Sequence, residues 1–249
     1  MTFSRSMLGS AAVAAALFSA CALSTPAAHA ATWSTTAAYG SYTVGSYSFN
    51  NDVWGSGAGA QTLWVNSVTD WGVWANHPDT GGIKSYPHIN LNVGKKISAL
   101  NTLKASVTAT TPSGGAWEST FDIWDSGNAH EIMLWFNYTG TSAGCGNVKP
   151  ISYNWSAAGC AIPVYTGVSV GGSTWNVYRG SNGGNLVYSF LRTTKTNAVS
   201  VDIKAILNYL VNLGWMSDVT MGDLQYGFEI TSSSGGLNYG AKNFSVTLN

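Results

Sequence analysis

The sequence predicts an all-β fold: two stacked antiparallel sheets forming a β-jelly-roll sandwich, with a curved cleft and one packed helix. Three observations favour this class. About a dozen short segments alternate apolar and polar residues between Gly-, Asn- and Ser-rich turns. A single segment has helical periodicity. Several predicted strands pair an apolar face with a face that carries Trp and carboxylates, which fits a sheet that bends around a groove.

The first thirty residues have the pattern of a secretory signal peptide. Arg5 supplies the positive charge, residues 11–23 are nearly all small or apolar, and Ala28-His29-Ala30 is a small-x-small cleavage site. We therefore expect a secreted protein whose mature chain, 31–249, is one domain. A lipid anchor on Cys21 is the alternative, which Phe18 three residues earlier disfavours.

The composition points to a neutral polar ligand. Only 9% of the residues are charged and the formal net charge is zero, which argues against nucleic acid or an anionic membrane as a partner. Eleven Trp exceed what a core of this size needs. Because aromatic faces stack on the C–H-rich faces of sugar rings, some of these Trp are expected to form a binding surface.

The predicted strands follow one another along the mature chain with turns between them. They are 39–49, 61–68, 71–74, 88–93, 104–109, 117–124, 130–137, 164–170, 174–178, 224–231 and 242–248. The last two follow the predicted helix and close the fold.

The strand at 130–137 has an unusual second face. A period of two places Glu131, Met133, Trp135 and Asn137 on one side and three large apolar residues on the other. A carboxylate between a thioether and an indole is unfavourable unless it serves a purpose.

The strand at 225–231 repeats that design, with Glu229 on the face opposite its apolar stripe. Glu118, Glu131 and Glu229 are the three glutamates of the chain. Taken alone, either Glu131 or Glu229 would be interpreted as a solvent-facing residue of a half-buried strand. Two of them among aromatics in so charge-poor a chain indicate a site, and paired carboxylates across a sugar-sized gap perform glycoside hydrolysis.

A third carboxylate is expected beside them. The strand 117–124 places Glu118, Asp122 and Trp124 on one face, and a short link then enters the strand of Glu131. An antiparallel hairpin would set Asp122 next to Glu131, where like charges raise a pKa. A plain surface aspartate is the alternative.

The remaining polar residues predict a disulfide and no metal site. Cys145 and Cys160 are the two cysteines of the mature chain and are expected to pair in an oxidising compartment. His77, His88 and His130 are scattered, so neither metal nor cofactor is expected.

Residues 164–214 contain two local sequence patterns, and the residues that follow each pattern decide its interpretation. Residues 167–171 match the G-x-S-x-G pattern of a serine nucleophile, but a Gly-Gly turn and a strand follow where a helix is required, so the match is interpreted as chance. Four apolar residues between 203 and 210 repeat at helical spacing, with Ser200 as the expected N-cap and Gly214 as the stop.

With these residues in place, the chain resembles glycoside hydrolase family 12, the secreted endo-β-1,4-glucanases and xyloglucanases with a jelly-roll fold. The resemblance runs over most of 31–249. Its anchors are Asn51-Asp52-Val53-Trp54-Gly55, Lys84-Ser85-Tyr86-Pro87, Asp122-Ile123-Trp124, Glu131-Ile132-Met133-Leu134-Trp135, Val170-Gly171-Gly172-Ser173-Thr174-Trp175 and Gly227-Phe228-Glu229.

The resemblance implies a single catalytic domain that cleaves β-1,4-glucan with retention and without a cofactor, acting as a monomer. It implies that Glu131 is the nucleophile, that Glu229 is the general acid/base and that Asp122 is bonded to the nucleophile. The expected substrate-binding residues are Trp54, which would stack on a sugar, together with Asp52, Met133, Trp135, Trp124 and Asn137.

Two departures from the family pattern leave the preferred substrate open, and two alternative functions also remain. Asp52 stands where the family usually has Asn, and the loop 139–162 is longer than usual, so the choice among linear glucan, mixed-linkage glucan and xyloglucan is open. A non-catalytic carbohydrate-binding sandwich, lectin-like or expansin-like, is the alternative from another class. A xylanase of the related jelly-roll family is the nearer one.

Overall fold

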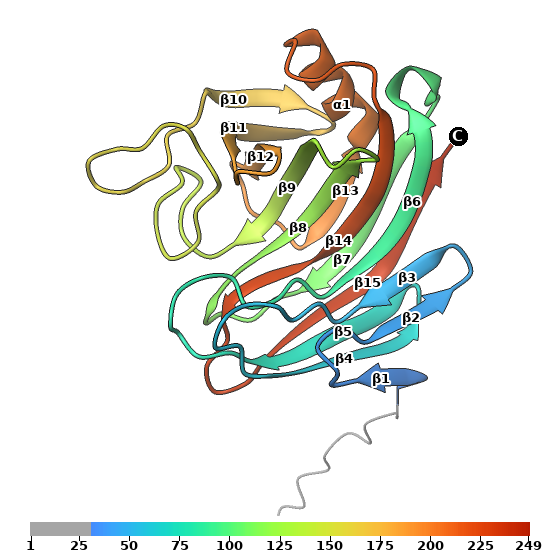
Figure 1. The fold of residues 1–249 in the computed structure, drawn as a ribbon, viewed down its shortest axis with the longest axis vertical. Coiled ribbons are helices and arrows are strands. Elements are labelled where there is room, and N and C mark those ends of the chain that lie inside the picture. Colours follow the sequence, from blue (N-terminus) through green and yellow to red (C-terminus); the bar gives the residue numbers. More distant parts are fainter. Residues whose placement is uncertain (1–30) are drawn as a thin grey trace, which may run out of the picture. The chain divides into compact units, whose positions relative to one another are not determined.

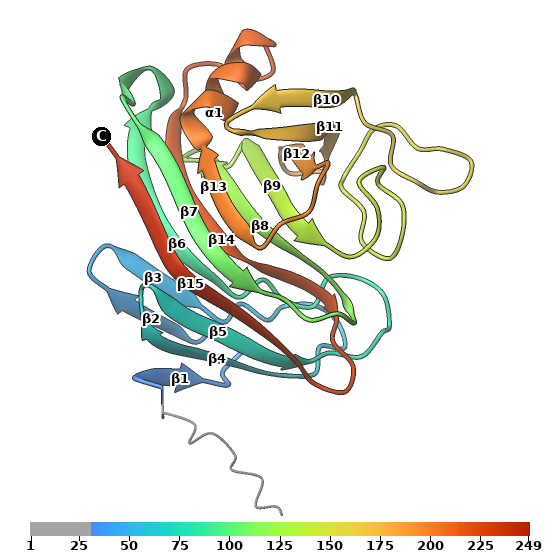
Figure 2. The ribbon, with the colours of Figure 1, turned by 180° about the vertical axis from the view of Figure 1, so that it is seen from behind.

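The computed structural model describes residues 31–249, which form one compact unit. The predicted signal peptide at 1–30 lies outside the described residues. Fifteen strands, one α-helix and one short 3₁₀ helix, η1 (Ile97–Ala99), build two stacked sheets, seen from opposite sides in Figure 1 and Figure 2. The predicted sandwich with one packed helix is confirmed.

The smaller sheet has six strands and is antiparallel throughout. In spatial order they are β1 (Trp33–Thr35), β4 (Ala60–Ser67), β5 (Asp70–Asn76), β15 (Leu237–Leu248), β7 (Leu103–Thr110) and β13 (Ala198–Asp202).

The larger sheet has nine strands. In spatial order they are β10 (Tyr165–Val170), β11 (Ser173–Ser181), β12 (Leu186–Arg192), β9 (His130–Tyr138), β8 (Ala116–Asp125), β14 (Thr220–Ser232), β6 (His88–Lys96), β3 (Tyr47–Asn50) and β2 (Ser41–Val44). The long strands β6 and β14 curve along their length in both views (Figure 1, Figure 2).

One strand pair departs from the predicted antiparallel pattern. β12 runs parallel to β9, with Val187 opposite Glu131. Parallel neighbours need a long connection, because the chain must return to the starting end of the sheet. The loop after β9 and the hairpin of β10 and β11 supply that connection. As a result, the turn that precedes β12 reaches the Glu131 end of β9.

The core lies between the two sheets and is built by the predicted apolar stripes. Ile132, Leu134 and Phe136 of β9 are each at most 1% exposed, and Tyr226 and Phe228 of β14 are fully buried. Because side chains alternate along a strand, burial of this stripe turns the opposite face of β8, β9 and β14 away from the core. That opposite face carries the predicted site.

The helix α1 (Ile203–Asn212) packs its apolar face onto the core, as predicted. Its N-cap differs from the prediction. Asp202 accepts a hydrogen bond from Ala205 N at 3.1 Å, whereas Ser200 lies within β13, whose pairing with β7 extends through Asp202. Leu213 is the C-cap, and Gly214 follows it with a φ of 68°, which fits the predicted C-terminal glycine.

The G-x-S-x-G pattern is confirmed as a chance match. Ser169 lies in β10, and Gly171 and Gly172 form the turn to β11, both with positive φ. A strand follows the serine, so no nucleophile elbow is formed.

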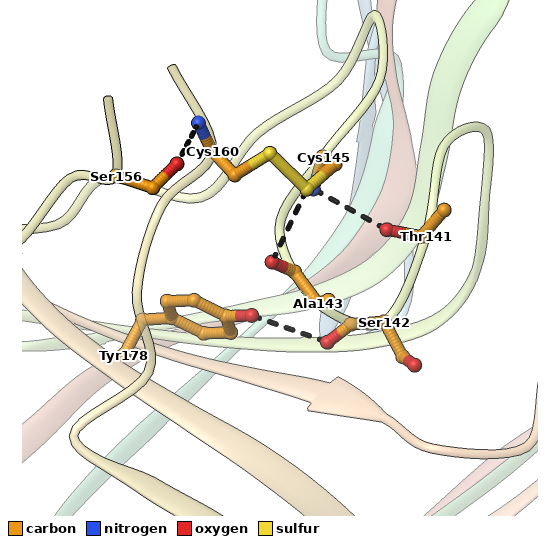
Figure 3. The surroundings of a disulfide bond; sticks show 7 residues. All are labelled: Thr141, Ser142, Ala143, Cys145, Ser156, Cys160 and Tyr178. Carbon is orange, nitrogen blue, oxygen red and sulfur yellow. Dashed lines mark hydrogen bonds between the residues drawn. A yellow bond between two sulfur atoms is a disulfide. The ribbon is translucent and has the colours of Figure 1, made fainter. Parts of the chain in front are cut away.

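The long loop between β9 and β10 carries the predicted disulfide, Cys145–Cys160 (Figure 3). Tyr178 of β11 donates its hydroxyl to Ser142 O at 3.1 Å beneath the disulfide (Figure 3). At the start of the loop, Lys195 Nζ donates to Tyr138 O at 2.6 Å. Both contacts therefore hold the first part of the loop in place.

No helix within residues 31–249 has the length and apolar character needed to cross a membrane.

Candidate active site

A cavity of about 810 Å³ lies on the outward face of β8, β9 and β14. Eight of the predicted site residues line it: Asp52, Trp54, Asp122, Trp124, Glu131, Met133, Trp135 and Glu229. They come from three strands and from the loop after β3, which are far apart in the sequence. The central expectation, that Glu131 and Glu229 converge on one groove, is met.

Glu131 lies at the start of β9 and is 7% exposed. Its Oε2 accepts hydrogen bonds from Asn185 Nδ2 at 2.8 Å and from Asn182 Nδ2 at 3.3 Å. Burial raises the pKa of Glu131 to about 7, the bond from Asn185 lowers it, and the charge of Glu229 raises it. Since an amide N–H can only donate, the two asparagines favour the ionised form of Glu131.

Glu229 lies on β14, separated from β9 by β8. Burial raises the pKa of the Glu229 carboxyl, and the neighbouring Glu118 carboxyl opposes that rise. The strand is held here by Ile230 N, which donates to Ser85 O at 2.9 Å. A side chain at Gly227 would place its Cβ 2.3 Å from Pro87 O, so only glycine allows this close approach.

Asp122 of β8 lies between the two glutamates on the same face. Its direct cross-strand partner is Met133, and Trp124 occupies the position opposite Glu131. Trp124 Nε1 donates to Asp122 Oδ2 at 3.0 Å. Burial and the neighbouring Glu131 raise the pKa of Asp122 well above its usual value, which the bond from Trp124 opposes. The direct Asp122–Glu131 hydrogen bond that the resemblance implies is not present among the described residues.

Trp54 stands at the rim of the cavity with 47% of its surface exposed. Its backbone N–H donates to Lys84 O at 3.2 Å, which holds the loop after β3 against the chain before β6. An exposed indole in a fixed position is suited to stacking on a sugar ring.

Asp52 lies in the same loop with a φ of 44°, a left-handed conformation in which Asp and Asn are enriched. Burial raises the pKa of its carboxyl. His88 Nδ1 lies 3.9 Å from Asp52 but only 2.6 Å from Tyr86 O, to which it donates. Burial lowers the pKa of His88 to about 4, so at neutral pH this contact is not an ion pair.

Met133 and Trp135 form the floor of the cavity, at 5% and 2% exposure. They pack into a second cluster with Tyr138 and Tyr178, outside the main core. The floor is therefore apolar and rigid, which suits contact with the C–H face of a sugar.

Asn137, which the resemblance implied to be a substrate-binding residue, does not line the cavity. The pairing of β8 with β9 shifts by one residue, so that Ser119 faces Asn137 but Thr120 faces Trp135. A bulge of this kind turns the following side chain to the other face. Asn137 Nδ2 donates instead to Asn197 Oδ1 at 2.7 Å, toward the smaller sheet.

Sequence reasoning missed several residues of the cavity wall. Asn182 and Asn185 belong to the turn between β11 and β12, whose approach to Glu131 depends on the parallel pairing of β12. Tyr86 follows the loop of Lys84, and Gln225 shares the outward face of β14 with Glu229. The position of Gln225 could have been inferred from strand alternation alone.

The arrangement has the chemistry of a glycoside hydrolase. Two carboxyls from separate strands enter one cavity, in unlike surroundings: Glu131 accepts from two amides, whereas Glu229 lies opposite another carboxyl. Such a pair supplies a nucleophile and a proton donor, and the aromatic wall and floor suit sugar rings.

Comparison with known proteins agrees with this class. The sequence profile of glycosyl hydrolase family 12 matches residues 45–249, and the chain belongs to that family. Among characterised relatives, Endoglucanase S of Pectobacterium parmentieri is 29% identical over 222 residues, 76% of this chain and 77% of the relative. The xyloglucan-specific endo-β-1,4-glucanase A of Emericella nidulans is 28% identical over 230 residues, 82% and 87% of the two chains.

Solved structures of the family have the same fold. The xyloglucanase domain of NopAA, an effector from Sinorhizobium fredii solved in complex with cellobiose, is 54% identical with a TM-score of 0.86, covering 88% of this chain and 99% of that one. The family 12 xyloglucanase of Bacillus licheniformis is 25% identical with a TM-score of 0.71, covering 87% and 100%.

Proposed function

We propose that this protein is an endo-acting hydrolase of β-1,4-linked glucans, xyloglucan among them, that works by double displacement with retention. The observation that carries the proposal is the convergence of Glu131 and Glu229 on one aromatic-lined cavity, each in the surroundings that its role requires. The named activities of the family 12 relatives support the choice of substrate.

In the first step Glu131 attacks the anomeric carbon while Glu229 gives its proton to the departing glycosidic oxygen. The C–O bond to the leaving chain breaks as the bond to Glu131 Oε forms. In the second step the Glu229 carboxylate takes a proton from water, whose oxygen displaces Glu131. The amides of Asn182 and Asn185 support the ionised state that Glu131 needs at the start.

Glu131 and Glu229 also influence each other's charge during the cycle. While Glu131 is ionised, its charge helps to keep the proton on Glu229, because each carboxylate disfavours the other. Once Glu131 is esterified to the sugar it is neutral, so Glu229 ionises more readily and can act as the base. The two roles of Glu229 therefore follow from one electrostatic coupling.

Xyloglucan is the first substrate to test. Two relatives that act on it are a 54% identical structure and a 28% identical fungal enzyme. The loop 139–162 contributes Lys149 and Ile151 to the cavity wall, where a branched chain would contact it. Asp52 adds a hydrogen-bond acceptor on the Trp54 side.

The test compares xyloglucan, linear glucan and mixed-linkage glucan as substrates, measuring both new reducing ends and viscosity. A fast loss of viscosity with few reducing ends indicates endo action, and proton NMR of the first product gives its anomeric form. We expect the β-anomer. We also expect Glu131→Ala to abolish turnover but to retain oligosaccharide binding. Substantial hydrolysis by that variant, or binding without hydrolysis by the wild type, would contradict the proposal.

We also propose that the protein is exported with cleavage after Ala30 and acts as a monomer. The charged start, apolar stretch and small-x-small site of residues 1–30 support export. N-terminal sequencing of the protein from culture medium tests the cleavage, and sedimentation of the mature chain tests the oligomeric state.

A further inference from the structure

Glu118 is a third glutamate behind the catalytic pair, and the mechanism above gives it no role. It lies on β8, is 0% exposed and is the direct cross-strand partner of Glu229 on β14. Its partner on the other side, in β9, is Tyr138. The carboxyl does not line the cavity, so it does not contact substrate.

The surroundings of Glu118 contain acids and phenols. Glu229 faces it from β14, Asp122 lies on its own strand, and Tyr86 approaches from the segment before β6. The phenols donate to other partners: Tyr86 to Thr120 O at 3.4 Å, and Tyr138 to Arg192 O at 2.8 Å.

Within residues 31–249, Glu118 forms no salt bridge, and neither of its oxygens has a hydrogen bond of standard geometry. A buried carboxylate without a cation or donor is strongly unfavourable, so the carboxyl keeps its proton. Burial and the charge of Glu229 accordingly hold the pKa of Glu118 well above its usual range. A neutral carboxyl has one O–H to donate, and Glu229 is the acceptor opposite it.

We propose that Glu118 is a positioning residue that stays protonated through the reaction cycle and donates its O–H to Glu229 whenever Glu229 is a carboxylate. The proposal rests on the acid/base role of Glu229 in the proposed function. No proton leaves Glu118. The proton that reaches the glycosidic oxygen comes from Glu229, and the proton that restores Glu229 comes from water.

The O–H of Glu118 gives the Glu229 carboxylate a hydrogen-bond donor from within the sheet. When Glu229 gives up its proton, a charge appears at a half-buried position on the cavity wall, and no salt bridge within residues 31–249 involves Glu229. A pre-placed O–H stabilises that charge as it forms, without reorganisation. In catalytic sites such bonds are often loose in the resting state and tighten when charge develops, which fits the missing standard geometry at Glu118.

The first test is the pH dependence of kcat/KM, whose basic limb reports the ionisation of Glu229. Glu118→Leu removes the donor, and a hydrogen bond to a charged group corresponds to about one to two pKa units. We expect the basic limb to move up by about one unit or more and kcat to fall. Glu118→Gln keeps an N–H donor, and its basic limb should stay within about half a unit of the wild type.

Two outcomes would overturn the proposal. If Glu118→Leu leaves both limbs in place, the residue is only structural. If Glu118→Gln moves the basic limb down by a unit or more, Glu118 is charged in the active enzyme, because removing a negative neighbour makes Glu229 easier to ionise. Ser119→Ala, a buried polar loss on the same strand but on its core face, is the matched control and should keep the wild-type profile.

A second measurement does not depend on turnover. The chain has only three glutamates, so selective labelling of the Glu carboxyl carbon gives three NMR signals to titrate. One signal should keep the shift of a protonated acid through neutral pH and should be absent in Glu118→Gln. Three signals that all ionise below pH 6 would sink the proposal even if the enzyme hydrolyses glucan. If the protein hydrolyses no glucan but still shows the protonated signal, Glu118 is protonated as inferred and the proposed function is wrong.

Discussion

Replacing Asn185 with alanine tests how the ionised nucleophile is maintained. Asn185 Nδ2 donates to Glu131 Oε2 at 2.8 Å, the shorter of the two amide contacts to that carboxylate. Burial already raises the pKa of Glu131 to about 7, and the Asn185 bond is the main contribution that lowers it. Without this bond the charged form of Glu131 loses support, so its pKa rises further.

The magnitude follows from the value of a hydrogen bond to a charged group, about 1.5–3 kcal/mol. At 1.36 kcal/mol per unit this is a rise of about one to two pKa units. The acidic limb of kcat/KM reports the ionisation of the nucleophile, so it should move to higher pH by that amount. Well below the limb, activity should fall about tenfold or more, whereas the basic limb should change little.

The assay is kcat/KM on a soluble xyloglucan oligosaccharide at closely spaced pH values. Asn182→Ala, which removes the longer contact of 3.3 Å, should give a smaller shift in the same direction. Asn66→Ala is the matched control, since Asn66 Nδ2 also donates to a carboxylate, Asp70 Oδ2 at 2.9 Å, but on the exposed surface. An acidic limb that stays in place or moves down in Asn185→Ala would refute the reasoning.

Three further predictions follow from the site and its loop. Trp54→Ala removes a 47% exposed stacking surface and should raise KM for long oligosaccharides about tenfold with a smaller change in kcat, which steady-state kinetics on chains of different length would show. Replacing Cys145 and Cys160 together with serine should lower stability by about 2–4 kcal/mol, measured by thermal unfolding, whereas an unchanged Tm would mean that the loop is held by its other contacts. Glu131→Gln should raise the Tm by a few degrees at pH 8 but not at pH 4. The reason is that the pKa of Glu131 is about 7 in the folded protein, above its value in the unfolded chain. The stability that protonated Glu131 contributes is therefore complete below pH 4.5 and is lost as the pH rises through 7.

The fold and the direction of three carboxylates could be predicted because they depend on alternation along single strands. Glu131, Asp122 and Glu229 each lie opposite an apolar stripe, and burial of that stripe fixes the direction of the carboxyl. The jelly-roll class followed from the same alternation repeated over many short segments.

The position of Asn137 and the cavity residues that sequence reasoning missed depend on features that a sequence pattern does not contain. Asn137 was placed by counting through a bulge, and one extra residue reverses the face of every side chain beyond it. Asn185 was missed because β12 joins β9 in parallel, a contact between strands that are separated by a long loop and a hairpin. Glu118 was assigned to the correct face, but its role depends on which residue of β14 lies opposite.

The turn of Asn182-Gly183-Gly184-Asn185 has a consequence for protein engineering. It is a hairpin connection at the surface that reaches Glu131 from outside, while the strands on either side are anchored in the sheet. Turns of this type accept insertions and exchanges without loss of the scaffold. A small library confined to these four positions therefore varies two properties together: the pKa of Glu131 and the access of branched polysaccharides to the cavity. It should leave the folding of the sandwich unchanged.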